Sequence, residues 1–146
     1  MPRKTRLAYA RDDRFVPEQR QDYRTAAQID RDRILYSPAL ARLAEVTQVV
    51  GAERGHVFHN RLTHSFKVAQ LARRLAEKLL REQPDEANAL GGIDPDVAES
   101  AGLAHDLGHP PFGHTAEETL NRVLKATGNV PDGFEGNAQV FAQSAG

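Results

Sequence analysis

The sequence predicts an all-α protein, and three observations lead to that prediction. Apolar residues in the periodic segments recur at the spacing of one face of a helix. No segment alternates apolar and polar residues as a half-buried strand does. Two pairs, Ser37-Pro38 and Asp94-Pro95, combine a helix-capping residue with a proline suited to the first helical position. We therefore expect a helical bundle.

The N-terminal residues 1–22 show little apolar periodicity, and we expect them to form a flexible, arginine-rich arm. Arginines at this density can meet phosphates, but aspartates are interleaved with them, so a solvated mixed-charge surface is the simpler interpretation. The folded part is expected to start at residue 23. Apolar spacing then predicts two short helices, over residues 29–35 and 38–50, with Ser37 as the cap of the second.

A long helix follows the glycine-containing segment 51–60, which we expect to be a loop. Apolar positions over residues 62–80 keep helical spacing without an intervening glycine or proline, and their leucines and alanines are expected to form core. Residues 83–92 are predicted to be a linker. The next helix is predicted to begin at Asp94-Pro95 and to end near Gly108.

The C-terminal part of the sequence predicts one more helix after a proline stop. Pro110-Pro111 prevents the preceding helix from continuing. Thr115 and Glu118 have the spacing of a capping box, and apolar residues after them carry a helix to Gly128.

Length and composition limit the chemistry that this protein can perform. The chain has 146 residues, enough for one domain, and a formal net charge of -1. It has no cysteine, which excludes disulfides, thiolate zinc sites and cysteine nucleophiles. No stretch approaches the roughly 20 apolar residues of a membrane span, and the N-terminus lacks the apolar region of a secretory signal. We expect a cytoplasmic protein that does not enter a membrane.

All six histidines fall into two short segments. One segment contains His56, His59 and His64, and the first two of these are expected to be peripheral. The other is the decapeptide HDLGHPPFGH, which contains His105, Asp106, His109 and His114. Imidazoles and carboxylates bind Mn, Fe, Co and Ni, while carboxylates and water suit Mg. The clustering therefore predicts a site for a divalent metal.

The predicted helices indicate which of these side chains meet. His64 lies near the start of the long helix and on its inner side. His105 follows Val97 and Ala101 on the expected buried stripe of the next helix, with Asp106 beside it. Two antiparallel helices would bring these ends together and supply three mixed nitrogen and oxygen ligands.

Several motifs in order resemble the deoxyguanosine triphosphate triphosphohydrolase family of the HD-domain superfamily. The resemblance covers roughly residues 22 to 142 and implies an HD-domain helical bundle. It rests on the motifs DRDRILYS from Asp30, RL from Arg42, TQV from Thr47, NRLTHS from Asn60, HDLGHPPFGH from His105 and FEGNAQ from Phe134.

The resemblance implies a role for each matching position. His64, His105 and Asp106 would hold the metal together with a distant final aspartate. The expected catalytic groups are the acid His114, its orienting partner Glu117 and the phosphate-site residue His109. The expected substrate-binding residues are Arg61 at the α-phosphate, Gln48 at the 3'-hydroxyl of the sugar, and Asn137, which lies in a family motif.

The family's reaction is the metal-dependent hydrolysis of a deoxynucleoside triphosphate to deoxynucleoside and triphosphate. Family members are usually far longer, and their final metal-ligating aspartate has no match here. We therefore expect residues 23–146 to be the N-terminal part of an HD-type metal-dependent phosphohydrolase domain, truncated at its C-terminus and exposing apolar surface. The family also implies a homo-oligomer for the full-length protein.

Two alternatives stand beside this interpretation. One is another HD-superfamily phosphohydrolase, acting on a nucleoside monophosphate or cyclic nucleotide, although the set Arg61, His114 and Glu117 argues against it. The other is a non-catalytic module that binds nucleotides or single-stranded nucleic acid, suggested by the arginine-rich start and the absent final ligand. The few aromatic residues are scattered, so the sequence gives no support to a stacking platform for nucleic acid.

Overall fold

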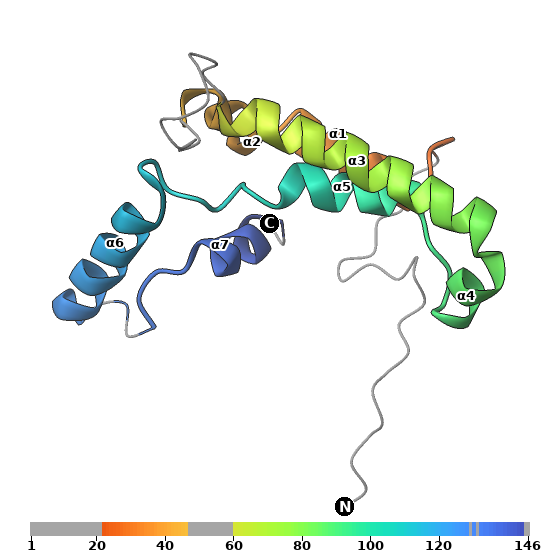
Figure 1. Ribbon diagram of the computed structural model, residues 1–146. Coiled ribbons are helices and arrows are strands. Elements are labelled where there is room, and N and C mark those ends of the chain that lie inside the picture. The colour runs from red at the N-terminus through yellow and green to blue at the C-terminus, as the bar shows by residue number, and fades with distance from the viewer. Residues whose placement is uncertain (1–21, 47–59, 129, 131, 145–146) are drawn as a thin grey trace, which may run out of the picture.

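The computed structural model describes residues 22–46, 60–128, 130 and 132–144, and every element assigned within these ranges is a helix (Figure 1). The predicted all-α class is therefore confirmed. The expected arm lies outside the described residues except for Asp22, and the expected loop 51–60 does so except for Asn60. The elements are α1 (Ala26–Leu35), α2 (Pro38–Arg42), the 3₁₀ helix η1 (Leu43–Glu45), α3 (Arg61–Glu82), α4 (Pro84–Ala89), α5 (Pro95–Ala104), α6 (Gly113–Thr127) and α7 (Gly136–Ser144).

The first two helices begin at side-chain caps. Thr25 and Gln28 form a capping box at the start of α1. Ser37 accepts a hydrogen bond from the Leu40 backbone N–H and caps α2, as predicted. The second short helix is shorter than predicted: α2 ends at Arg42, and η1 tightens the chain up to Glu45. The remainder of that prediction lies outside the described residues.

Helices α3 and α5 form the centre of the fold and run antiparallel, side by side in Figure 1. Gly102 of α5 makes this close approach feasible. A Cβ atom at Gly102 would lie 2.6 Å from the Ala69 Cα atom, a distance that no side chain tolerates. At the far end of the pair, Arg73 of α3 forms ion pairs with Asp96 and Glu99 of α5. The predicted bounds of both helices agree with the structure to within a few residues.

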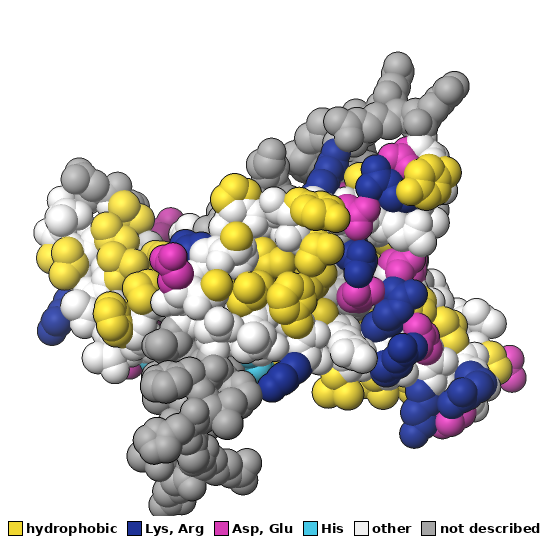
Figure 2. All heavy atoms as spheres, turned by 90° about the horizontal axis from the view of Figure 1, so that it is seen from above, with side chains coloured by type: hydrophobic (Ala, Val, Ile, Leu, Met, Phe, Trp, Pro, Cys, Tyr) yellow, Lys and Arg dark blue, Asp and Glu magenta, His cyan; other side chains and the backbone are white. Residues whose placement is uncertain are grey.

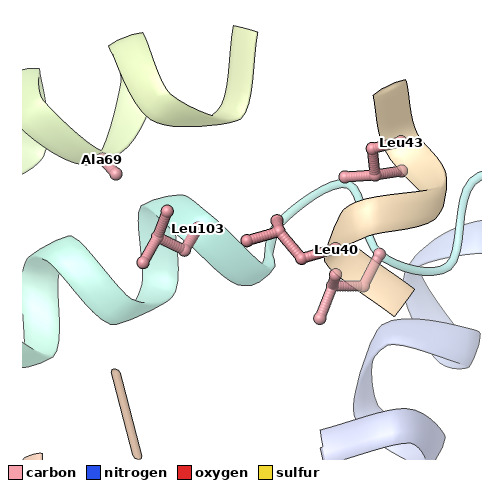
Figure 3. Close-up of a cluster of buried hydrophobic side chains, with 5 residues drawn as sticks. Leu40, Leu43, Ala69 and Leu103 are labelled. Atoms are coloured by element: carbon pink, nitrogen blue, oxygen red, sulfur yellow. The ribbon is translucent and has the colours of Figure 1, made fainter. Parts of the chain in front are cut away.

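The hydrophobic core is small and lies where α2, η1, α3 and α5 meet (Figure 3). It consists of Leu40, Leu43, Ala69, Leu103 and Leu107, each at most 4% exposed. The core therefore connects the helices that carry the histidines to the N-terminal helices, and it reaches the segment just after α5.

Two predictions about the helix faces are wrong. On α3, Ala69 and Ala76 are buried, but Leu71 is 71% and Leu75 is 53% exposed, so not every apolar residue there is core. On α5 the stripe through Val97 is largely exposed, because the face that packs between α1 and α3 instead contains Ser100, Gly102 and Leu103. Figure 2 shows hydrophobic side chains gathered on the outer face around α3, with positive and negative side chains interleaved farther along.

Two predictions about helix boundaries are also wrong. The expected linker 83–92 contains α4, which begins with Pro84 at its first position and has two acidic residues in its first turn. Helix α6 begins at Gly113, two residues before Thr115, so Thr115 lies inside the helix and the predicted capping box is absent. Phe112 precedes α6 in the left-handed conformation, with φ of 68°, and makes no side-chain cap. The predicted end of this helix at Gly128 is confirmed.

Helices α6 and α7 follow the proline segment, and α6 lies apart from the α3–α5 pair (Figure 1). The start of α7 packs closely on the chain that leaves α5. A Cβ atom at Gly108 would lie 2.2 Å from the Gly136 carbonyl oxygen, so only glycine fits at this point. Within the described ranges, no helix combines the length and the apolar composition needed to span a membrane.

Candidate metal centre

The structure brings together three of the predicted metal ligands. His64, His105 and Asp106 each offer one ligand atom, and these atoms lie within 4.8 Å of one another. His64 belongs to the first turn of α3. Asn60 caps the start of this helix, because the Asn60 side chain accepts a hydrogen bond from the Thr63 N–H at 2.9 Å. His105 and Asp106 directly follow α5. The antiparallel arrangement predicted for the two helices therefore creates the cluster.

His105 is oriented by a bond to its own helix. Its Nδ1 atom lies 2.8 Å from the Gly102 carbonyl oxygen, which can only accept, so Nδ1 carries the proton. This bond leaves the Nε2 lone pair free to bind a metal, as in other metal-binding histidines. The rings of His64 and His105 meet edge to face with centroids 5.2 Å apart. Both imidazoles therefore reach the same small volume.

Asp106 is the most buried member of the cluster, with a relative exposure of 4%. Its Oδ1 atom accepts a hydrogen bond from Arg61 Nη1 at 2.7 Å, and the two side chains form an ion pair. Its Oδ2 atom is buried and, among the described residues, has no hydrogen-bond partner; it lies 3.5 Å from His105 Nε2. A buried carboxylate oxygen without a partner carries a free-energy penalty that a cation would offset.

The donor set fits a divalent cation. Burial lowers the pKa of His64, which keeps its imidazole neutral and able to coordinate near neutral pH. Two neutral imidazoles and one carboxylate are the ligands that Mn, Fe, Co and Ni accept, and they leave coordination positions for water or a phosphate oxygen. His64, His105 and Asp106 are therefore the residues that would hold the metal.

His109 lies beside the cluster. Its side chain is 16% exposed, and its Nδ1 atom is 3.5 Å from Asp106 Oδ1. That nitrogen is buried and makes no hydrogen bond to the part of the chain that the structure describes. It therefore has hydrogen-bonding capacity left for a ligand that enters beside Asp106.

His114 and Glu117 form a pair on the first turn of α6. His114 Nδ1 lies 3.2 Å from Glu117 Oε2, and the His114 side chain is 89% exposed. The other carboxylate oxygen of Glu117 accepts a 2.6 Å hydrogen bond from the Gly136 N–H at the start of α7. That backbone bond, followed by the bond to His114, lowers the pKa of Glu117. Glu117 thus connects α6 to α7 and is hydrogen-bonded to the imidazole of His114.

The predicted substrate-binding residues differ in their surroundings. Arg61 lies at the cluster, with its guanidinium already paired with Asp106. Asn137 is exposed on α7, and its backbone N–H donates to the Glu135 carboxylate at 3.1 Å. Gln48 lies outside the described residues.

One contact at the site had no signal in the sequence. Arg42 donates to the carbonyl oxygens of Leu107 and His109, more than sixty residues away. Neither periodicity nor local spacing reports such a contact, because it depends on how α2 packs against the end of α5.

The fold and the site together define a class: helical domains in which a histidine from one helix joins an adjacent His-Asp pair from another. The sequence of residues 61–144 matches the family model described as HD domain, and the chain belongs to this family.

Curated relatives extend this result. The chain is 48% identical over 120 residues to a protein from Corynebacterium efficiens, and the match covers 82% of the chain and 24% of the relative. It is 46% identical over 128 residues to a Caulobacter protein, with 88% of the chain and 28% of the relative covered. It is 43% identical over 141 residues to a Jannaschia protein, with 93% of the chain and 32% of the relative covered. All three are named deoxyguanosinetriphosphate triphosphohydrolase-like protein. The chain spans about a quarter to a third of the length of these relatives.

Proposed function

We propose that this chain forms the metal- and phosphate-binding part of a metal-dependent deoxynucleoside triphosphate triphosphohydrolase, which releases deoxynucleoside and triphosphate. The observation that carries the proposal is the convergence of His64, His105 and Asp106 within 4.8 Å, with Arg61 bound to the same carboxylate. The names of the relatives support the substrate class. The pair His114 and Glu117 supplies a proton donor with its orienting partner.

A divalent cation at this cluster would offset charge on phosphate oxygens and lower the pKa of a bound water molecule. The protein side chains around it have separate tasks. The guanidinium of Arg61 carries a permanent charge and presents several N–H groups in a plane, a geometry that matches a phosphate group. Its Nε atom is buried and, within the described chain, without a hydrogen-bond partner, so it retains a donor for an α-phosphate oxygen.

The proposed reaction breaks the bond between the α-phosphorus and the 5'-oxygen of the sugar, and a water oxygen forms the new bond to phosphorus. The departing 5'-oxygen needs a proton. Glu117 binds Nδ1 of His114 and leaves Nε2 on an exposed side chain, where it can donate that proton to a bound substrate. A positioned acid of this kind contributes about 10²–10⁴-fold to the rate. No protein nucleophile is required, because phosphoryl transfer depends mainly on placement and charge.

A product assay tests the proposal directly. The 146-residue chain is incubated with each deoxynucleoside triphosphate and added Mn or Mg, and triphosphate is separated from pyrophosphate. Triphosphate release that is abolished in His105→Ala and retained in His56→Ala, a histidine outside the HDLGHPPFGH motif, would support the proposal. Pyrophosphate as the product, or equal turnover in wild type and His105→Ala, would contradict the mechanism. Metal and nucleotide binding without turnover would mean either that catalysis needs residues outside the part of the relatives that this chain spans, or that the chain is a non-catalytic binding module.

A further inference from the structure

The segment between α5 and α6 carries two groups of the candidate metal centre. Asp106 and His109 flank the dipeptide Leu107-Gly108, where the chain has already left α5. Two backbone hydrogen bonds shape this turn: the Leu107 N–H donates to the Ala104 carbonyl at 3.0 Å, and the His109 N–H donates to the Asp106 carbonyl at 3.1 Å. Carbonyl groups at a helix end lack helical partners, and the prolines that follow have no N–H to offer.

Arg42 provides a hydrogen-bond partner for two carbonyl groups of the segment that follows α5. Its Nη2 atom donates to the Leu107 carbonyl oxygen at 2.9 Å and to the His109 carbonyl oxygen at 3.2 Å. Both acceptors lie one residue away from Gly108, on either side of it. Hydrogen bonds from a charged donor are stronger than neutral ones. A single cationic group thus bridges the carbonyl groups of Leu107 and His109, on either side of Gly108.

The backbone of Arg42 is itself firmly placed. Arg42 is the last residue of α2, and its neighbours Leu40 and Leu43 are 1% and 0% exposed. Both leucines belong to the same core cluster as Leu103 and Leu107. The core therefore packs the helix that carries Arg42 against the segment that Arg42 binds. A donor on such a rigid base holds its acceptor more precisely than a donor on a loop.

The other side of the turn rests on α7. Gly108 packs directly against Gly136 and against the backbone of Val140, with no room for a Cβ atom. The turn is therefore held from two sides, by the guanidinium of Arg42 and by the start of α7. Between these supports, Asp106 directs its carboxylate to Arg61, and His109 lies beside the same carboxylate.

We propose that Arg42 is a positioning residue for the metal centre: by binding the carbonyl groups of Leu107 and His109, it holds Asp106 and His109 in the geometry that receives the metal and the phosphate. The proposal rests on the proposed function of the site. The hydrogen bonds of Arg42 go to backbone carbonyl groups and not to the side chains of the three metal ligands, so its effect passes through the backbone. Groups that support ligands in this way typically change metal affinity by about 10–100-fold when removed.

The first test uses the metal-free chain. Arg42→Met keeps an apolar stem but removes the donor, and Arg81→Met is the matched control because Arg81 is 77% exposed near the end of α3. We expect amide hydrogen exchange at Leu107 and His109 to become about 10-fold faster in Arg42→Met and to stay at the wild-type rate in Arg81→Met. Unchanged exchange at both amides would overturn the positioning role.

The second test measures metal binding without any substrate. Cobalt(II) is titrated into each variant, and its visible absorption spectrum reports the affinity and the coordination geometry. We expect the Kd for cobalt to rise about 10-fold in Arg42→Met and to recover in Arg42→Lys, whose ammonium group keeps a charge and several donors. Urea unfolding of each variant distinguishes this effect from a general loss of stability.

The outcomes separate the two proposals. Equal cobalt affinity and equal spectra in wild type and Arg42→Met would overturn the role of Arg42 while the proposed function stands. A wild-type chain that binds no cobalt would refute the metal-dependent function itself, even if the amide exchange shows that Arg42 holds the turn.

Discussion

Arg61 and a metal ion are expected to act on the same carboxylate, and the substitution Arg61→Met separates their contributions. The side chains of Arg61 and Asp106 are only 13% and 5% exposed and form a 2.7 Å ion pair. Removing one partner from a buried pair costs about 3–5 kcal/mol, because the remaining charge stays uncompensated. The modest exposure of Arg61 favours the lower end, so we expect the free energy of unfolding to fall by about 3 kcal/mol.

A divalent cation should reverse much of this loss. Ligand binding to the folded state at a concentration of 100 Kd stabilises a protein by about 2.7 kcal/mol. In Arg61→Met the cation would meet an unpaired carboxylate and no neighbouring guanidinium charge, so its affinity is expected to rise. The gain in stability on adding Mn should therefore be larger in Arg61→Met than in the wild type.

Urea unfolding followed by circular dichroism, with a chelator and then with saturating Mn, measures both quantities. Arg61→Lys keeps the charge and is expected to lose less than Arg61→Met, while Arg81→Met controls for removing an exposed arginine. The reasoning is refuted if metal-free Arg61→Met is within about 0.5 kcal/mol of the wild type, the range of ordinary surface substitutions. It is also refuted if Mn stabilises the wild type more than the variant.

Two further predictions concern the core and the connection between α6 and α7. Leu103 is 2% exposed in the core, so Leu103→Ala should lower the free energy of unfolding by about 2–5 kcal/mol, measured by urea unfolding. Leu90 is 83% exposed, so the control Leu90→Ala should change that free energy by less than about 0.5 kcal/mol. Equal effects would show that the core cluster contributes little. The pKa of Glu117 is lowered in the folded state, so its carboxylate stabilises the fold above its unfolded pKa and loses that contribution as the pH falls through the folded pKa. We therefore expect the wild type to be more stable than Glu117→Gln at pH 7, and the difference in the free energy of unfolding to shrink as the pH is lowered to 3. A difference that stays constant with pH would contradict the lowered pKa of Glu117.

The sequence predicted the parts of the fold that depend on local pattern. The helical spacing over α3 and the Asp94-Pro95 start of α5 could be recognised without any knowledge of packing, and together they placed His64 near His105 and Asp106. The buried faces of these two helices were harder to predict. Leu71 is more hydrophobic than Ser65, yet Ser65 is buried and Leu71 is 71% exposed. At the crossing of α3 and α5 the backbone of Gly102 lies so close to Ala69 that no Cβ atom fits, and hydrophobicity alone does not report such an approach.

The boundary errors have physical reasons as well. The segment 83–92 contains Pro84, Asp85 and Glu86, a helix start that the glycines after it obscured. Phe112 adopts a left-handed conformation that is uncommon for a bulky side chain, and this turn lets α6 begin before the cap that the pattern favoured. The contact of Arg42 with the segment after α5 is long-range, so no window of the sequence contains both partners.

Two side chains of the candidate centre are held by hydrogen-bond partners, and the third is placed by its helix. His105 is bound to the Gly102 carbonyl, Asp106 to Arg61, and His64 lies in a helical turn whose start is capped by Asn60. These contacts are made by the protein's own groups, and the ion pair with Arg61 compensates the charge of the carboxylate. We therefore expect a divalent cation to add charge to an existing geometry instead of folding it. A chelator is accordingly expected to leave α3 and α5 packed, unlike in small domains in which metal binding drives folding.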